Sequence, residues 1–304
     1  ECDIIDQTSG LEDQSELLLE LNDTNQLYAS FVPGTVWEHI DFGIQSNEYD
    51  DGYQIGIDRP DYFSDVRTRR AFIMCMDRQA LVDTILFGQS IVIDTYVPPD
   101  HPLHNPEVRH YQYDPEAGSA LLDEVGWKDE DNDPLTPRIA QGITNVPDGT
   151  PLELRYETTA TNLREQVASI LQQSLSECGI GVNIELDASG GVWDRLFNRE
   201  FELGEFAWLT GVEPPCDLFL SNMVGGPEGS EKWISILDGL ERPINMWGQN
   251  LIGFVNQEYD LACNAALNSL PGQQSYKSDH LEAQKFFAEQ LPVVPLFLLS
   301  LIHI

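Results

Sequence analysis

The chain has 304 residues, of which 41% are hydrophobic, so it can bury a sizeable core and its length predicts about two domains. Its formal net charge of −35 excludes nucleic acid and anionic lipid as partners, because phosphate-rich surfaces would be repelled before contact. The most apolar stretch, Leu291 to Ile304, is interrupted by Pro292 and Pro295 and cannot form a transmembrane helix, so we expect a soluble globular protein.

The acidity has two explanations, which the sequence leaves open. A surface rich in carboxylates resists aggregation and stays well solvated. Alternatively, the protein works in salty surroundings, where a Debye length of about 3 Å at 1 M salt mutes the repulsion between its own charges.

The first third of the chain predicts helices and one strand separated by a polar connection. We expect a short helix over residues 11–21 and a strand over residues 36–44. Residues 47–60 are rich in Asp, Gly and Asn, which is typical of a connection between structural units. Residues 64–87 then have helical spacing, with Asp77 placed to cap the second of two helices.

The middle of the chain has the pattern of a βαβ unit. Alternating apolar and charged residues predict a strand over residues 152–157, and an amphipathic helix follows over residues 162–178. A second strand is predicted over residues 182–186, after Gly179. Strand, helix and strand within about 35 residues favour an α/β domain with at least partly parallel pairing.

The last third adds a shorter set of elements. The pattern predicts a short helix over residues 193–199 and a strand over residues 201–209 that leads into a loop rich in Gly and Pro. Two further helices are predicted over residues 259–267 and 280–291.

The cysteines are scattered, without a CxxC pair, so neither a zinc knuckle nor a thioredoxin motif is present. Cys75 falls within an apolar helical pattern and is expected to be a buried thiol. A disulfide among Cys2, Cys178, Cys216 and Cys263 would fit an oxidising compartment, but their spacing does not fix the pairing.

Motifs that carry chemistry are absent from the sequence. No GxSxG, HExxH or Walker loop occurs, so no cofactor is predicted. Asp129, Asp131 and Asp133 alternate as at the start of a calcium loop, yet Pro134 replaces the glycine that such a loop needs. An acidic hairpin turn is the favoured interpretation.

Seven segments form an ordered set of family-like motifs. They are Cys2-Asp-Ile, Arg59 to Phe72 followed by Met76-Asp-Arg-Gln-Ala-Leu, Tyr113-Asp-Pro-Glu-Ala with Leu121 to Trp127, Gly179-Ile-Gly-Val, Trp208, Asn256 with Tyr259 and Asp260, and Pro292-Val-Val-Pro-Leu. In this order and spacing, they resemble the peptide and nickel class of extracellular solute-binding proteins that serve ABC importers. The resemblance covers nearly the whole chain, from Glu1 to about Phe297.

The resemblance implies an α/β fold of the type II periplasmic-binding-protein kind and no enzymatic activity. Members of this class are two-lobed clamps that close on a solute by hinge bending. Since the family is normally longer, we expect residues 1–44 to be a remnant of the first lobe, residues 45–285 the second lobe and residues 286–304 a return segment to the first. The resemblance also implies a monomer outside the cytoplasm, periplasmic or a lipoprotein anchored at the cell surface, with a peptide or similar small solute and an ABC permease as partners.

The loop after Trp208 is the best candidate for contact with the solute. A rigid aromatic side chain beside a Gly and Pro rich turn can line a cleft at low entropic cost, although a core tryptophan is an equal alternative. Thr210, Gly211 and Glu213 belong to the same candidate site. Peptide-binding relatives carry an aspartate at the position of Gly211, so Glu213 is the nearest acid available to a ligand amino group.

Arg195 and Glu205 complete the candidate site. Glu205 occupies a position at which some relatives use arginine to bind the carboxylate of a peptide. A free carboxylate would be repelled by Glu205 unless Arg195 or Arg199 compensates.

Two alternatives from other functional classes remain. His101, His104 and His110 offer nitrogen ligands for a metal-dependent hydrolase, although Pro102 and Pro106 predict an extended loop rather than a helix face. A signalling or surface-adhesion protein built on the same clamp is the other alternative.

Overall fold

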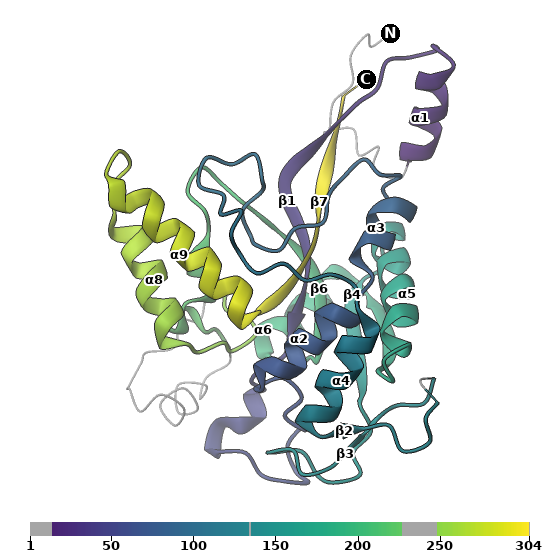
Figure 1. Ribbon diagram of the computed structural model, residues 1–304, viewed down its shortest axis with the longest axis vertical. Helices are drawn as coiled ribbons and strands as arrows, with labels where there is room; N and C mark the ends of the chain where they lie inside the picture. The colour runs from purple at the N-terminus through teal and green to yellow at the C-terminus, as the bar shows by residue number, and fades with distance from the viewer. Residues whose placement is uncertain (1–13, 134, 227–247, 304) are drawn as a thin grey trace.

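The structure is a computed structural model, and it describes residues 14–133, 135–226 and 248–303. One mixed five-stranded sheet lies at its centre, in the order β5-β4-β6-β1-β7, with helices on both of its faces (Figure 1). The strands are β1 (Ser30–Phe42), β2 (Trp127–Lys128), β3 (Ile139–Ala140), β4 (Glu153–Thr159), β5 (Gly181–Asp187), β6 (Leu203–Leu209) and β7 (Val293–His303). The α-helices are α1 (Ser15–Asp23), α2 (Val66–Cys75), α3 (Arg78–Thr84), α4 (Pro115–Val125), α5 (Asn162–Ser176), α6 (Ser189–Asn198), α8 (Gln257–Asn268) and α9 (Gln274–Gln290).

Half of the sheet is parallel and half is antiparallel. β4 pairs in parallel with both β5 and β6, whereas β1 runs antiparallel to β6 and β7. The predicted βαβ unit is therefore confirmed, with α5 as its crossover helix. Because β4, β5 and β6 point the same way, they all end at one edge of the sheet, at Thr159, Asp187 and Leu209. We call this the carboxyl edge.

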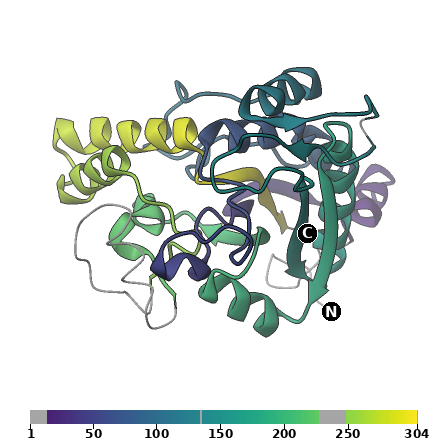
Figure 2. The same ribbon diagram turned by 90° about the horizontal axis from the view of Figure 1, so that it is seen from below.

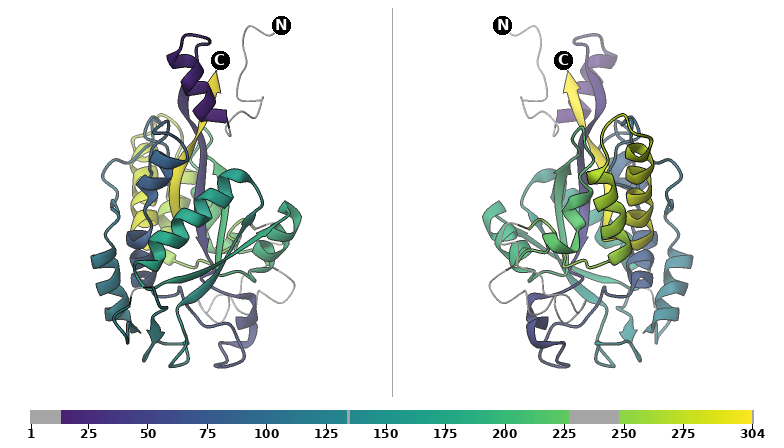
Figure 3. Two further views of the ribbon diagram at one scale, coloured as in Figure 1. Left: turned by 90° about the vertical axis from the view of Figure 1, so that its right-hand side faces the viewer. Right: turned by 90° about the vertical axis from the view of Figure 1, so that its left-hand side faces the viewer.

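The two strands that pass beyond the rest of the sheet are β1 and β7. They remain paired to their far ends, where Ser30 lies opposite His303, and they rise together at the top of Figures 1 and 3. The sequence predicts a start near Val36, six residues late, because Pro33 interrupts the alternation. Pairing with β7 continues past Pro33 through a register shift that the side-chain pattern does not reveal.

Helices lie on opposite faces of the sheet. Seen from below in Figure 2, α6 lies on one side of the strands, and α2 and α4 lie on the other. The predicted helix start at Asp77 is confirmed, since its carboxylate accepts a hydrogen bond from the backbone N–H of Ala80, and Asp114 caps α4 in the same way. Within the described residues, no helix has both the length and the apolar character needed to cross a membrane.

Several element boundaries differ from those predicted. Of the first predicted helix, residues 11–13 lie outside the described residues, and the rest belongs to α1. Helix α9 begins at Gln274 rather than His280, because its first turn is polar and adds nothing to the apolar periodicity. Because α9 continues to Gln290, the expected domain limit between residues 285 and 286 falls inside this helix.

Two disulfides connect segments that are distant in sequence. Cys75 at the end of α2 is bonded to Cys178 after α5, and Cys216 is bonded to Cys263 on α8. The expectation that Cys75 is a free thiol is wrong, because α2 packs beside the end of α5 and brings the two Cα atoms within 6.2 Å. Cys2 lies outside the described residues.

Removal of either disulfide is expected to destabilise the fold by about 2–5 kcal/mol, because each restricts the unfolded chain. The double variant Cys75→Ser/Cys178→Ser should cost more than Cys216→Ser/Cys263→Ser, since the sequence separations are 103 and 47 residues. Urea denaturation measures both, with Cys2→Ser as the control. Equal stability of all variants and the wild type would contradict the prediction.

Candidate functional site

A cavity of about 460 Å³ lies at the carboxyl edge of the sheet. It is bounded by the turns that follow β4 and β5, by one face of α6, by the start of α5 and by the end of β6. The lining residues are Thr159, Ala160, Thr161, Arg164, Asp187, Ala188, Ser189, Val192, Trp193, Leu196, Phe206 and Ala207. Ligands of open α/β sheets bind outside the carboxyl ends of the strands, so we take this cavity as the candidate site.

Two helices begin at the cavity. The hydroxyl of Thr161 caps α5 by accepting a hydrogen bond from the backbone N–H of Arg164, at 3.4 Å. Helix α6 begins after Ala188, which has no side chain that could cap it, and Ser189 in its first turn lines the cavity. The N-terminal ends of both helices are electropositive and therefore favour polar oxygen atoms in the cavity.

An aromatic wall borders one side of the cavity. Trp193 of α6 and Phe206 of β6 line it, with ring centroids 5.1 Å apart. Trp208 packs behind them, 5.3 Å from Phe206 and 6.2 Å from Trp193. On the neighbouring strand β1, His39 lies opposite Phe206 and Trp37 opposite Trp208, so the wall continues into the core. Such a wall offers rigid apolar surface for a solute.

Arg164 is the cationic side chain in the cavity lining, and it is already paired. Its Nη2 and Nε donate to Oε1 of Glu38 at 2.9 and 3.3 Å, and its Nη1 donates to the hydroxyl of Thr159 at 2.7 Å. The Glu38 side chain is 2% exposed and that of Arg164 is 17% exposed. Glu38 and Thr159 therefore orient the guanidinium, and the Arg164 side chain lines the cavity.

Glu205 lies beside this ion pair and is fully buried. Glu38 and Glu205 project from the same face of neighbouring strands, because Glu38 pairs with Ala207, two residues after Glu205. Burial raises the pKa of Glu205 well above its usual range, the negative charge of Glu38 raises it further, and Arg164 only partly opposes the shift. Burial therefore favours the protonated, neutral form of the Glu205 carboxyl group, and Tyr156 lies close to it.

Arg195 is turned away from the cavity toward two carboxylates. Its Nε donates to the buried Glu157, and its Nη1 lies 3.0 Å from Oδ2 of Asp187. Burial raises the pKa of Glu157, whereas the hydrogen bond from Arg195 lowers the pKa of Asp187. Arg195 therefore ties α6 to the ends of β4 and β5 and fixes one rim of the cavity.

The loop after Trp208 leads away from the aromatic wall toward α9. The hydroxyl of Thr210 is buried and donates to the carbonyl of Tyr96, whereas Gly211 and Glu213 are exposed. Glu213 lies 4.0 Å from Nε2 of His280, a buried side chain of α9 whose pKa is lowered by burial. This loop thus lies beside the cavity rather than in its lining.

The three histidines of the hydrolase hypothesis do not converge. His101 contacts the carbonyl of Val212, His104 contacts that of Val97, and His110 pairs with Asp94 at 2.8 Å. Among the residues that the structure describes, no group of three or more His, Cys, Asp or Glu side chains could hold a metal ion.

The acidic stretch from Asp129 to Asp133 connects β2 and β3, which form an antiparallel pair. Its carboxylates accept hydrogen bonds from nearby backbone N–H groups, such as that of Asn132 to Asp129 at 2.8 Å. The predicted acidic hairpin is therefore confirmed.

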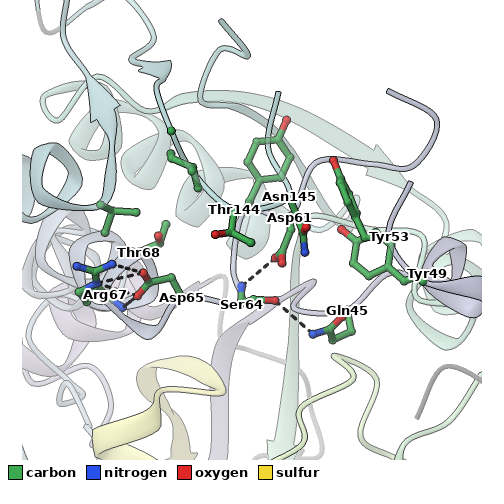
Figure 4. Close-up of a pocket in the computed structure, with 15 residues that line it drawn as sticks. Gln45, Tyr49, Tyr53, Asp61, Ser64, Asp65, Arg67, Thr68, Thr144 and Asn145 are labelled. Carbon is green, nitrogen blue, oxygen red and sulfur yellow. Dashed lines mark hydrogen bonds and ion pairs between the residues drawn. The ribbon is translucent and has the colours of Figure 1, made fainter. Parts of the chain in front are cut away.

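A second cavity, of about 450 Å³, lies at the opposite end of the sheet (Figure 4). Gln45, just after β1, lines it together with Asp61, Asp65 and Arg67. Asp65 caps α2 and pairs with Arg67 at 2.6 Å, and Asp61 accepts a hydrogen bond from the backbone N–H of Ser64. These charged groups already stabilise the local fold, so this cavity is the weaker candidate.

None of the six residues predicted from the sequence lines the cavity at the carboxyl edge. Trp208 and Arg195 contact lining residues, Glu205 is buried beneath them, and Thr210, Gly211 and Glu213 belong to the adjacent loop. Three lining residues, Arg164, Trp193 and Phe206, were not predicted from the sequence. The signal that could have found them is the predicted βαβ unit, since the turns at the carboxyl ends of its strands are where a site is expected.

Comparison with known proteins gives a consistent result. The profile of a family described as "Bacterial extracellular solute-binding proteins, family 5 Middle" matches residues 2–230. An oligopeptide-binding protein of Bacillus subtilis, AppA, is 22% identical over 249 residues, which are 79% of this chain and 40% of that protein. Di/tripeptide-binding protein 2 of Pseudomonas aeruginosa is 26% identical over 238 residues, which are 78% of this chain and 38% of that protein.

The fold also matches solved structures. An oligopeptide-binding protein of Thermus thermophilus in complex with a pentapeptide superposes with a TM-score of 0.71 at 27% identity, covering 90% of this chain and 43% of that protein. The fold is therefore the predicted α/β fold of periplasmic binding proteins. The chain spans about 40% of the length of these relatives.

The raised pKa of Glu205 predicts a pH dependence of stability. Because its pKa in the folded protein lies above that in the unfolded chain, the protonated form favours folding. The free energy of unfolding of the wild type should therefore fall relative to that of Glu205→Gln as the pH rises above 4.5, the ordinary glutamate value. Urea denaturation from pH 4 to pH 9 measures this, with Glu165→Gln at an exposed position of α5 as the control. Parallel pH profiles for the wild type and Glu205→Gln would contradict the assignment.

Proposed function

We propose, since the chain belongs to family 5 of the bacterial extracellular solute-binding proteins, that it captures a peptide or similar small solute outside the cytoplasm for an ABC importer. The cavity at the carboxyl edge is the observation that carries this proposal. It combines a rigid aromatic wall, the guanidinium of Arg164 and the N-terminal ends of two helices. This combination suits a solute with apolar side chains and a polar backbone.

The position of the cavity fits a two-lobed clamp. β6 ends at the carboxyl edge, and β1, which is antiparallel to it, enters the sheet from that same side. The extended pair of β1 and β7 therefore leaves the lobe beside the cavity. We assign residues 45–292 to the second lobe and residues 1–44 and 293–304 to the connections with the first, so that the exit lies at β7 rather than within α9, where the limit between residues 285 and 286 was expected. Closure of the first lobe over the cavity would bury the solute.

The site supports binding of a solute rather than its hydrolysis. The histidines of the hydrolase alternative contact three separate groups, so that alternative is not supported. The disulfides between Cys75 and Cys178 and between Cys216 and Cys263 suit an oxidising compartment outside the cytoplasm. We further propose that the protein acts as a monomer, because an ABC permease would recognise one closed clamp.

Truncation of the aromatic wall tests the proposed site. Trp193→Ala and Trp208→Ala are expected to weaken binding by about 1–3 kcal/mol, or about tenfold to a hundredfold, because the first removes a half-buried ring that lines the cavity and the second removes the ring that packs behind it. Native mass spectrometry of the full-length protein with a pool of tripeptides to hexapeptides measures retention. Leu270→Ala, at a position 64% exposed, is the control.

Retention of peptides by both tryptophan variants at the wild-type level would rule out this cavity as the site. If the wild type itself retains no peptide, the proposed function is wrong.

A further inference from the structure

The guanidinium of Arg164 lines the cavity and has donors beyond those used within the protein. An arginine has five N–H bonds, and three of those of Arg164 are directed to Glu38 and Thr159. Two N–H bonds remain, one on each Nη atom. A solute oxygen in the cavity can therefore accept a hydrogen bond from this guanidinium.

The charge of Arg164 is nevertheless already balanced. The buried Glu38 pairs with it at 2.9 Å, and burial raises the pKa of Glu205 and so favours its neutral form. Tyr156 and Thr158 of β4 are the other polar groups that face Glu205, and both are uncharged. The ion pair of Glu38 and Arg164 is thus balanced without a solute charge.

The remaining charges at the cavity do not favour an anion either. Asp187 is the acidic side chain in the lining, and it shares Arg195 with the buried Glu157. A free carboxylate at Arg164 would place a second negative charge beside Glu38 and near Asp187, around one guanidinium. Like charges held this close are unfavourable, whereas a neutral carbonyl carries no such cost.

We propose that Arg164, held by Glu38, binds a neutral carbonyl oxygen of the solute, such as that of a peptide group, and discriminates against a free carboxylate. This inference rests on the proposed function and specifies the solute class at the same site. Glu38 is a positioning residue, which acts through Arg164. The subsite therefore suits the interior of a peptide chain or an amidated end rather than a free carboxyl terminus.

Acetamide and acetate test this directly, because they are alike in shape and differ in charge. NMR titration of the 15N-labelled full-length protein follows the backbone N–H resonances of Thr161 and Ser189, which line the cavity and are present in every variant. In the wild type, acetamide should shift these resonances at least as strongly as acetate. In Glu38→Gln, the affinity for acetate relative to acetamide should rise about tenfold or more, since about 1.4 kcal/mol of repulsion is removed. The control Glu165→Gln removes an exposed carboxylate from α5, the helix of Arg164, and should keep the wild-type preference between acetamide and acetate.

Preferential binding of acetate by the wild type, or an unchanged order in Glu38→Gln, would overturn the inference. If Glu38→Gln fails to fold, Arg164→Lys tests the inference instead, because lysine keeps the positive charge but lacks the planar guanidinium and its donors. Its acetamide response should be lost, and persistence of that response would overturn the inference. The titration requires no knowledge of the natural cargo, so its failure is distinct from a failure to retain peptides.

Discussion

The antiparallel pairing of β1 with β6 is the interaction on which the site depends. Its register places Trp37 opposite Trp208 and His39 opposite Phe206, so their rings form one face. The alternate residues, including Glu38 and Glu205, are directed to the other face, under α5. A slip of one residue would exchange the two sets, bury aromatic rings against Arg164 and expose the carboxyl groups among the rings of α6. One strand register therefore sets both the apolar and the polar side of the cavity.

The buried carboxyl groups of this acidic chain are accommodated in different ways. Glu38 is paired with Arg164, and Glu157 is paired with Arg195. Glu205 has no ion pair with another described residue, and burial raises its pKa, which favours the neutral form. From the sequence, Glu205 was expected to repel a ligand carboxylate. Because burial favours the neutral form of Glu205, the negative charge that discriminates against a carboxylate is instead that of Glu38. Glu38 was not among the predicted site residues.

The fold could be predicted from the sequence further than the site could. Regular apolar spacing identified the βαβ unit and the helix cap at Asp77, because these depend on local pattern. The full length of β1 could not be predicted, since its first residues are fixed by pairing with β7, over 260 positions away. The disulfide between Cys75 and Cys178 could not be predicted either, since these cysteines are 103 positions apart and meet only in the folded chain. Arg164 was not predicted because its role depends on Glu38 of β1, and helical spacing along α5 does not show which strand residue lies beside it.

A crystal structure of the full-length protein with a bound peptide is the most direct measurement of the central claim. The account predicts peptide density between the starts of α5 and α6, against the rings of Trp193 and Phe206, with a peptide carbonyl within hydrogen-bonding distance of Arg164. Peptide bound instead in the cavity at the opposite end of the sheet, beside Asp61 and Arg67, would contradict it.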